Sequence, residues 1–208
     1  MPVPKEIEVK LAVGSHHAVA KAVRAAGGVF LGSFLQTDRF FDWPDRSLRL
    51  SDCGLRVRTV RRLRGPAGRP RVRHLVTFKG PRLARKGIKI RPEHETGIDD
   101  PEVLIDILQA LGLRPMLTIQ KRRSRYRLGR CQVELDELPA LGRFVEVEGK
   151  SERAVLSLCR RLGLRGEGIT RSYVAMIDAH YGGLPDGAEV TFASPLPARS
   201  RRRRAARA

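Results

Sequence analysis

Charged and apolar residues alternate one for one in several short stretches of this chain, and the alternation predicts much of its structure. Residues 5–13 read KEIEVKLAV. On a β-strand, side chains two positions apart share a face. Glu6, Glu8 and Lys10 therefore point to one side of a strand, and the apolar residues between them point to the other. The pattern predicts a strand over about residues 3–13 with one charged face.

Similar patterns predict about eight strands in all, separated irregularly by helices. Helices are expected at 15–26, behind Ser15 as N-cap, at 101–111, where a proline opens a run of apolar residues at helical spacing, and at 151–163 and 171–181. Their spacing is too irregular for a doubly wound parallel sheet and favours an antiparallel meander. The further strands are expected at about 29–41, 55–60, 72–79, 88–96, 116–127, 131–136 and 143–149.

Seven of these strands carry charge on one face, and several of the faces are wholly acidic or wholly basic. The wet face of an ordinary antiparallel sheet would carry Thr, Ser, Gln and mixed charges. Here nearly every position is Glu, Asp, Lys or Arg. Beyond the first strand, the shared faces are Arg56 with Arg58, Thr77 with Lys79, Lys89 with Arg91, Glu93 and Glu95, Lys121 with Arg123, Glu134 with Asp136, and Glu146 with Glu148.

Two structures could accommodate these charged faces. They could be the solvated side of a half-buried sheet. Alternatively, eight strands could close into a barrel whose interior holds a small ligand. Buried charges need partners, so a charged interior predicts a metal-chelated polyanion, with phosphates on the basic wall and a divalent metal on the acidic wall. The recurrence of the pattern favours the barrel.

The charge balance also points to an anionic partner. The formal net charge is +19, from 41 Lys and Arg against 22 Asp and Glu, and it is +13 without the six arginines of the last ten residues. A basic body fits nucleic acid, a membrane surface or a polyphosphate. Gly, Pro, Ala and Arg dominate residues 183–208. We expect a single domain over 1–182 and a disordered basic tail over 183–208, with nonspecific nucleic-acid contacts at most.

Other features indicate a protein of the reducing cytoplasm. No signal peptide is visible, and no apolar run approaches the ~18 residues of a membrane span, so no membrane partner is expected. The three cysteines are far apart and odd in number, which fits neither a zinc site nor a disulfide framework.

The ordered motifs resemble those of the CYTH superfamily, the triphosphate tunnel metalloenzymes. This family includes class IV adenylyl cyclases, thiamine triphosphatases and bacterial inorganic triphosphatases. One position departs from the family pattern, because Phe40 stands where the family has tyrosine. The matching motifs run in family order over about residues 4–178: Glu6-x-Glu8-x-Lys10, Gln36-x-Asp38, Leu55-Arg56-Val57-Arg58, Thr77-Phe78-Lys79-Gly80-Pro81, Arg91-x-Glu93-x-Glu95, Lys121-x-Arg123, Leu135-Asp136, the block 141–148 and Ser172-Tyr173.

The resemblance implies an α+β fold, with an eight-stranded antiparallel β-barrel forming a triphosphate tunnel and helices packed outside. It implies Mg²⁺ or Mn²⁺ on all-oxygen ligands. Arg91 either binds phosphate or pairs with tunnel carboxylates. The implied substrate-binding residues are Lys10, Arg56, Arg58, Lys79, Arg91, Lys121 and Arg123. The implied metal ligands are Glu6, Glu8, Glu93, Glu95, Asp136, Glu146 and Glu148, and the implied catalytic residues are Glu6, Glu8, Lys10, Asp136, Glu146 and Glu148.

Three functions remain open at this point. The first is metal-dependent hydrolysis of a triphosphate, whether inorganic tripolyphosphate, thiamine triphosphate or a nucleoside triphosphate. The second is a class IV adenylyl cyclase, which would convert ATP to cyclic AMP and pyrophosphate. The third is a noncatalytic module that binds polyphosphate or RNA, although a pure binder needs no wall of carboxylates. A monomer and a homodimer are equally compatible with the sequence.

Overall fold

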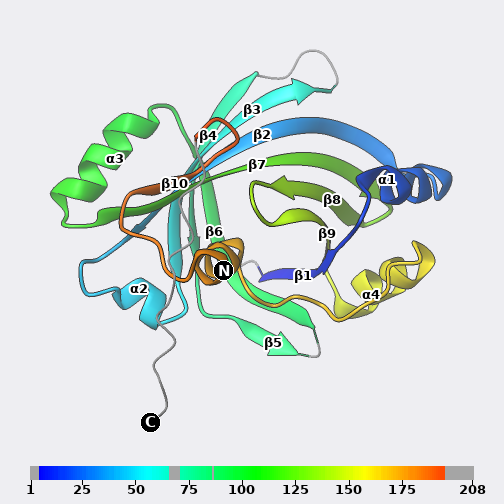
Figure 1. Cartoon of the computed structure of the whole chain (residues 1–208). Coiled ribbons are helices and arrows are strands. Elements are labelled where there is room, and N and C mark those ends of the chain that lie inside the picture. The colour runs from blue at the N-terminus through cyan, green and yellow to red at the C-terminus, as the bar shows by residue number, and fades with distance from the viewer. Residues whose placement is uncertain (1–4, 66–70, 86, 195–208) are drawn as a thin grey trace, which may run out of the picture.

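Eight strands close into one antiparallel barrel in the computed structural model (Figure 1), which confirms the fold expected from the sequence. The structure describes residues 5–65, 71–85 and 87–194, with the backbone alone for Lys5 and residues 83–85. The strand order is β1-β9-β8-β7-β2-β3-β4-β6, and pairing of β6 with β1 closes the ring. The eight strands are β1 (Lys5–Ala12), β2 (Val29–Asp42), β3 (Gly54–Arg64), β4 (Val72–Lys79), β6 (Ile88–Ile98), β7 (Arg114–Leu128), β8 (Cys131–Leu138) and β9 (Gly142–Gly149).

The strand register brings the charged faces together on the inside of the barrel. Glu8 of β1 lies opposite Glu148 of β9 on one side and opposite Lys89 of β6 on the other. Lys10 lies opposite Glu146. Residues directly opposite each other on neighbouring strands share a face of the sheet. The polar and charged side chains that become buried in this way include Glu8, Lys10, Asp38, Arg58, Thr77, Lys89, Lys121, Arg123, Glu134, Asp136 and Glu146.

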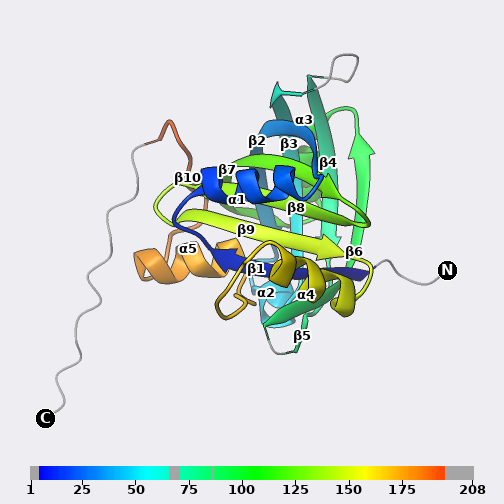
Figure 2. The ribbon, with the colours of Figure 1, turned by 90° about the vertical axis from the view of Figure 1, so that its right-hand side faces the viewer.

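Helices cover the apolar outside of the barrel. The helix α1 (His16–Ala25) is capped by the Ser15 side chain, and α4 (Glu152–Arg161) is capped by Ser151. Figure 2 shows both helices over the sheet formed by β1, β8 and β9, where Val23, Val145 and Val155 share one buried apolar cluster. The apolar periodicity of these helices therefore matches the apolar outer face of the strands.

Two more helices pack against other parts of the barrel. The helix α3 (Pro101–Ala110) begins behind the Asp100 cap and packs against β2 and β3. The helix α5 (Tyr173–Tyr181) begins behind Ser172, ends at Gly182, and buries Ile177 against β7 and β9. None of the helices in the described part of the chain is long and apolar enough to cross a membrane.

Three short elements differ from the sequence-based expectation. The helix α2 (Ser47–Leu50) and the strand β5 (Leu83–Arg85), which pairs with β6, were not predicted. The strand β10 (Ala188–Val190) pairs in parallel with β7, and Val190 is fully buried. The expectation of a disordered tail from residue 183 is therefore wrong for 183–194, because apolar side chains there join the α5 cluster. Residues 195–208 lie outside the described part.

Candidate active site in the barrel interior

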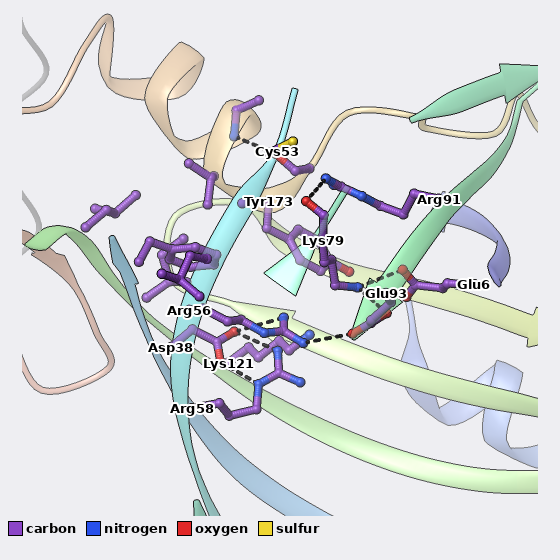
Figure 3. Close-up of a pocket in the computed structure, with 18 of the residues that line it drawn as sticks. Glu6, Asp38, Cys53, Arg56, Arg58, Lys79, Arg91, Glu93, Lys121 and Tyr173 are labelled. Carbon is purple, nitrogen blue, oxygen red and sulfur yellow. Dashed lines mark hydrogen bonds and ion pairs between the residues drawn. The ribbon is translucent and has the colours of Figure 1, made fainter. Parts of the chain in front are cut away.

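A cavity of about 810 Å³ occupies the barrel interior, and side chains from strands all around the ring line it (Figure 3). All of the site residues predicted from the sequence line this cavity except Asp136. The Asp136 side chain is fully buried and instead contacts two basic side chains that line the cavity, Lys121 and Arg123. The lumen is large enough for a small-molecule ligand, for which pockets of roughly 300–1,000 Å³ are usual.

The β2–β3 side of the interior carries a pair of arginines held by one carboxylate. The Arg58 Nη2 donates to Asp38 Oδ2 at 2.7 Å, and Arg56 Nη1 lies 3.7 Å from the same oxygen. Arg56 also donates from Nε to Thr77 Oγ1 at 3.2 Å. Although burial opposes ionisation of Asp38, the two arginines lower its pKa. Asp38 therefore holds two planar guanidinium groups side by side, a geometry that suits bidentate contacts with phosphate oxygens.

Lys79 joins two carboxylates on adjacent strands. Its Nζ lies 2.7 Å from Glu6 Oε2 and 2.8 Å from Glu93 Oε2. Burial opposes ionisation of Glu6, but Lys79 and Lys89 outweigh it and lower its pKa. Figure 3 shows the Lys79 amine pointing toward the Glu6 and Glu93 side chains on the same side of the barrel interior. Glu6 is thus ionised at neutral pH and balanced by lysine charge.

A second basic group lies on the β7 and β1 side of the interior. Lys121 Nζ is 3.2 Å from Asp136 Oδ2, Arg123 Nε donates to Asp136 Oδ1 at 2.6 Å, and Arg123 also contacts Glu146. Lys10 Nζ is 3.4 Å from Glu146 Oε1. Burial, with Arg123 beside it, lowers the pKa of Lys121 to about 8. These three cations share the buried carboxylates of Asp136 and Glu146, and Arg123 also pairs with the buried Glu134.

One group of carboxylates carries more negative charge than its surroundings neutralise. Burial, with Glu146 and Glu6 nearby, raises the pKa of Glu8 to about 7, even though Lys89 contacts it. Burial, with Glu134 and Glu6 nearby, raises the pKa of Glu148 to about 7. Within the described residues, Glu148 forms no ion pair. The surplus of negative charge lies where β1, β8 and β9 meet.

These carboxylates fit a divalent cation by their chemistry. Oxygen donors at a site of excess negative charge suit Mg²⁺ or Mn²⁺, whose charge would lower the repulsion among them. In the described part of the chain, no three acidic, histidine or cysteine side chains lie in a ligating arrangement as they stand. Several of the acids are instead turned toward lysine and arginine. The residues that would hold the ion are Glu6, Glu8, Glu134 and Glu148.

Arg91 is placed differently from the other predicted phosphate-binding residues. Its Nε donates to the Gly80 carbonyl at 2.8 Å, and its Nη2 donates to the Asp52 carbonyl at 2.9 Å. Its Nε and Nη2 are thus directed at main-chain oxygens at one end of the cavity. In this position Arg91 orders the turn after β4 rather than pairing with a tunnel carboxylate.

The interior contains functional groups that the sequence-based list of site residues did not include. Asp38 holds the arginine pair, and its place in the Gln-x-Asp motif was the available signal. Lys89 and Glu134 were recognised on charged strand faces, but the resemblance assigned them no role. Tyr173 lies with its ring 4.0 Å from Lys10 Nζ and 5.2 Å from Lys121 Nζ. The position of Tyr173 at the start of a predicted helix gave no sign that its ring would contact lysines of two different strands.

One end of the cavity is apolar and bordered by ion pairs. Arg49 Nη2 lies 2.8 Å from Asp178 Oδ2, which joins α2 to α5, and Arg46 pairs with Asp186. The cavity therefore has a charged part and an apolar part, as an amphipathic ligand would require. The apolar lining residues here are Phe40, Met116, Leu117, Ile119, Leu138, Val174 and Leu184.

Comparison with known families agrees with this geometry. The model of the CYTH domain matches residues 4–173, which is most of the chain. The chain belongs to the CYTH family. The match covers every strand of the barrel and ends at Tyr173, the residue that contacts Lys10 and Lys121.

Individual CYTH relatives carry two kinds of description. The chain is 30% identical to the adenylate cyclase CyaB of Aeromonas hydrophila, over 81% of this chain and 86% of that protein. A structure described as a putative adenylate cyclase from Vibrio parahaemolyticus superposes with a TM-score of 0.72 at 22% identity, covering 85% of this chain and 99% of that one. The structure of a putative adenylyl cyclase from Hippeastrum, whose description reports a dominant triphosphatase activity, superposes with a TM-score of 0.65 at 20% identity. The superposition covers 86% of this chain and 97% of that one.

Proposed function

We propose that this CYTH protein hydrolyses an organic triphosphate in the barrel interior with the help of Mg²⁺ or Mn²⁺. The observation that carries the proposal is the pairing of every cationic group around Asp38, Asp136 and Glu146 with a carboxylate in one closed lumen. Phosphate oxygens can replace those carboxylates as partners of the arginines and lysines. The carboxylates so released need a new cation, which the metal supplies.

The roles of the side chains follow from their positions. Arg56 and Arg58 would hold one phosphoryl group, and Lys10, Lys121 and Arg123 would hold another from the opposite wall. Both groups are ordered before the substrate arrives, so little is lost in orienting them. The bound metal would polarise the phosphoryl oxygens and neutralise developing charge. The ionised carboxylate of Glu8 or Glu148 would accept a proton from the attacking water, and the pairing of β1 with β9 holds these two residues opposite each other.

The apolar end of the cavity supports an organic substrate over inorganic tripolyphosphate. Inorganic tripolyphosphate has no organic group, so the apolar side chains of Met116, Leu117 and Leu184 would face a charged and solvated ligand. A nucleoside or thiamine group would instead cover them and gain about 25 cal/mol for each Å² of apolar surface buried. The apolar lining therefore favours a triphosphate ester.

A second candidate function is cyclisation of ATP to cyclic AMP and pyrophosphate. Two observations favour it. The Aeromonas relative is named an adenylate cyclase at 30% identity, and the apolar end could hold a nucleoside beside the phosphates. In cyclisation the ribose 3′ hydroxyl, rather than water, would attack the α-phosphorus.

The products of the reaction test both candidates. The purified protein is incubated with ATP, thiamine triphosphate or tripolyphosphate, with Mg²⁺ or Mn²⁺ and separately with EDTA. Metal-dependent orthophosphate from the organic triphosphates is the expected result. Cyclic AMP with pyrophosphate from ATP would establish the cyclase. Tight binding without turnover, unchanged in EDTA, would overturn both and leave a noncatalytic polyphosphate- or RNA-binding module.

Comparing a Lys79→Ala variant with wild type tests whether any measured turnover takes place in the barrel interior. Lys79 contacts two carboxylates in the lumen and is partly exposed. Its removal should lower turnover by roughly 10²–10³-fold, as loss of a preorganised charge in a desolvated site usually does. The matched control is Lys21→Ala on the exposed face of α1, which should leave the rate unchanged.

A further inference from the structure

A second cavity lies on the outer surface of the barrel, away from the lumen. It has a volume of about 610 Å³, and its lining residues are Arg24, Phe30, Ser33, Arg64, Gly65, Ser124 and Tyr126. None of these residues lines the central cavity. Tyr126 belongs to the apolar cluster between α1 and the outer face of the sheet. The cavity is therefore bounded by α1, the end of β3, and the adjacent strands β2 and β7.

Irregular strand pairing opens the sheet at this place. The register of β2 against β7 shifts between Phe30 and Gly32, and the register against β3 shifts between Ser33 and Phe34. Two shifts within five residues occur nowhere else in the described barrel pairings. Such bulges re-aim side chains and are enriched beside functional sites. Here they surround Ser33, one of the cavity-lining residues.

The polar side chains of this cavity are rich in hydrogen-bond donors. Arg24 Nη2 donates to the Tyr126 hydroxyl at 3.2 Å, so the phenolic proton is available to a further acceptor. Ser33 Oγ and Ser124 Oγ are 2.8 Å apart, and in such a pair one of the two hydroxyl protons remains available. The described lining contains two guanidinium groups and no Asp or Glu.

Arg64 is the lining side chain of this cavity for which the described structure shows no interaction. Within the described residues its side chain has no hydrogen bond, ion pair or ring contact. Among the residues with a described position, the Arg24 side chain is engaged only by Tyr126, through the hydroxyl contact and with its guanidinium carbon 5.7 Å from the ring centroid. Two arginines that face one cavity without a carboxylate repel each other, and a bound dianion would remove that repulsion.

We propose that this outer cavity is a second anion site, which takes inorganic phosphate or a phosphomonoester independently of the barrel interior. Arg24 and Arg64 would grip the phosphate oxygens, and the hydroxyls of Tyr126 and the Ser33–Ser124 pair would donate to them. The volume exceeds the needs of a bare phosphate, and the Phe30 ring lies 5.3 Å from that of Tyr126. The same site therefore has room for the organic part of a nucleoside monophosphate.

Calorimetric titration of the full-length protein with orthophosphate, and separately with a nucleoside monophosphate, tests the proposal. Wild type should bind one equivalent more than an Arg24→Gln/Arg64→Gln variant. The control, Arg114→Gln/Arg165→Gln, removes the same charge from two exposed arginines outside both cavities and should bind like wild type. Equal affinity for both anions would indicate recognition of phosphate alone. Tighter binding of the nucleotide would show that the aromatic wall contributes.

The single variant Arg64→Gln guards against misfolding, because the side chain it replaces is exposed and makes no hydrogen bond or ion pair to the described part of the chain. It should weaken the outer site at least tenfold while basal turnover in the barrel stays unchanged. A crystal soaked in phosphate should show the anion between Arg24 and Arg64. The proposal is overturned if the double variant binds both anions as wild type does, or if the anion occupies only the barrel interior.

Discussion

Glu146 and Glu148 lie two positions apart on one strand, and yet they should respond differently when each is changed to glutamine. Glu146 is buried against Lys10 and Arg123, which lower its pKa well below the usual range despite its burial. Glu146→Gln removes a buried carboxylate that Lys10 and Arg123 share, and should lower the free energy of unfolding by about 3 kcal/mol. Chemical denaturation measures this loss.

Glu148→Gln removes a carboxylate that its neighbours repel. Its loss should leave the free energy of unfolding unchanged or raise it, while turnover falls by roughly 10²–10³-fold because a metal-holding group is gone. Measuring denaturation and turnover on the two variants in parallel separates the roles. Equal destabilisation by both variants would contradict the assignment of Glu148 to the surplus negative charge.

The charge of Lys121 should limit substrate binding at high pH. Its pKa is about 8 because it is buried beside Arg123, below the ordinary value near 10.4. Only the charged amine binds phosphate well, so KM for the triphosphate should rise as the pH passes upward through 8. Lys121→Arg keeps its charge throughout this range and should remove that rise. A KM that varies equally with pH in both proteins would refute the assignment.

At the scale of secondary-structure elements, the segment after α5 is part of the fold. Val190 is fully buried and, with Leu184, packs in the cluster that holds α5 to β7. Truncation after Gly182 should therefore cost at least about 2 kcal/mol of stability, the usual value of one buried aliphatic side chain. Truncation after Ser194 keeps β10 with Val190 and is the matched comparison. Thermal unfolding of the two proteins decides whether the domain ends at 182, as expected from the sequence, or after β10.

The strands with charged inner faces could be predicted from the sequence because charged and apolar residues alternate along them with period two. The strand β1 is the clearest case, with Glu6, Glu8 and Lys10 on one face. The short elements lack that signal. The strand β10 has three residues after a Pro-Asp-Gly turn, and α2 has four. Both are held by tertiary contacts, which local patterns do not encode.

At the scale of the whole molecule, the charged residues could be predicted but their partners could not. Alternation places Lys79 and Glu6 on charged faces, yet only the closure of β6 on β1 brings these two side chains within 2.7 Å. The same limit applies to Arg91. It lies on a charged face as expected, but its Nε and Nη2 donate to main-chain oxygens at the turn after β4. Which ion pairs form depends on the register of the closed barrel.

The balanced interior predicts that metal and triphosphate bind cooperatively. A triphosphate alone would take the lysines and arginines from their carboxylates and leave those acids buried and uncompensated, whereas a metal alone would meet carboxylates already paired. Each ligand should therefore strengthen the other, by roughly 5–150-fold if the coupling is of ordinary size. Calorimetric titration with a slowly hydrolysed triphosphate analogue, with and without Mg²⁺, measures the factor. Equal affinity in both titrations would contradict the exchange of partners.

This cooperativity should also depend on pH, in a direction fixed by Glu8 and Glu148. Both have pKa values near 7, raised from 4.5, so the folded protein holds more protons than the unfolded chain between those values. Without metal, these two groups therefore make the fold less stable as the pH rises through that window. Metal binds the ionised forms and competes with protons. The increase in Tm caused by Mg²⁺ should accordingly be larger above pH 7 than below it. In Glu148→Gln that difference should shrink, whereas a pH-independent increase in wild type would place the metal elsewhere.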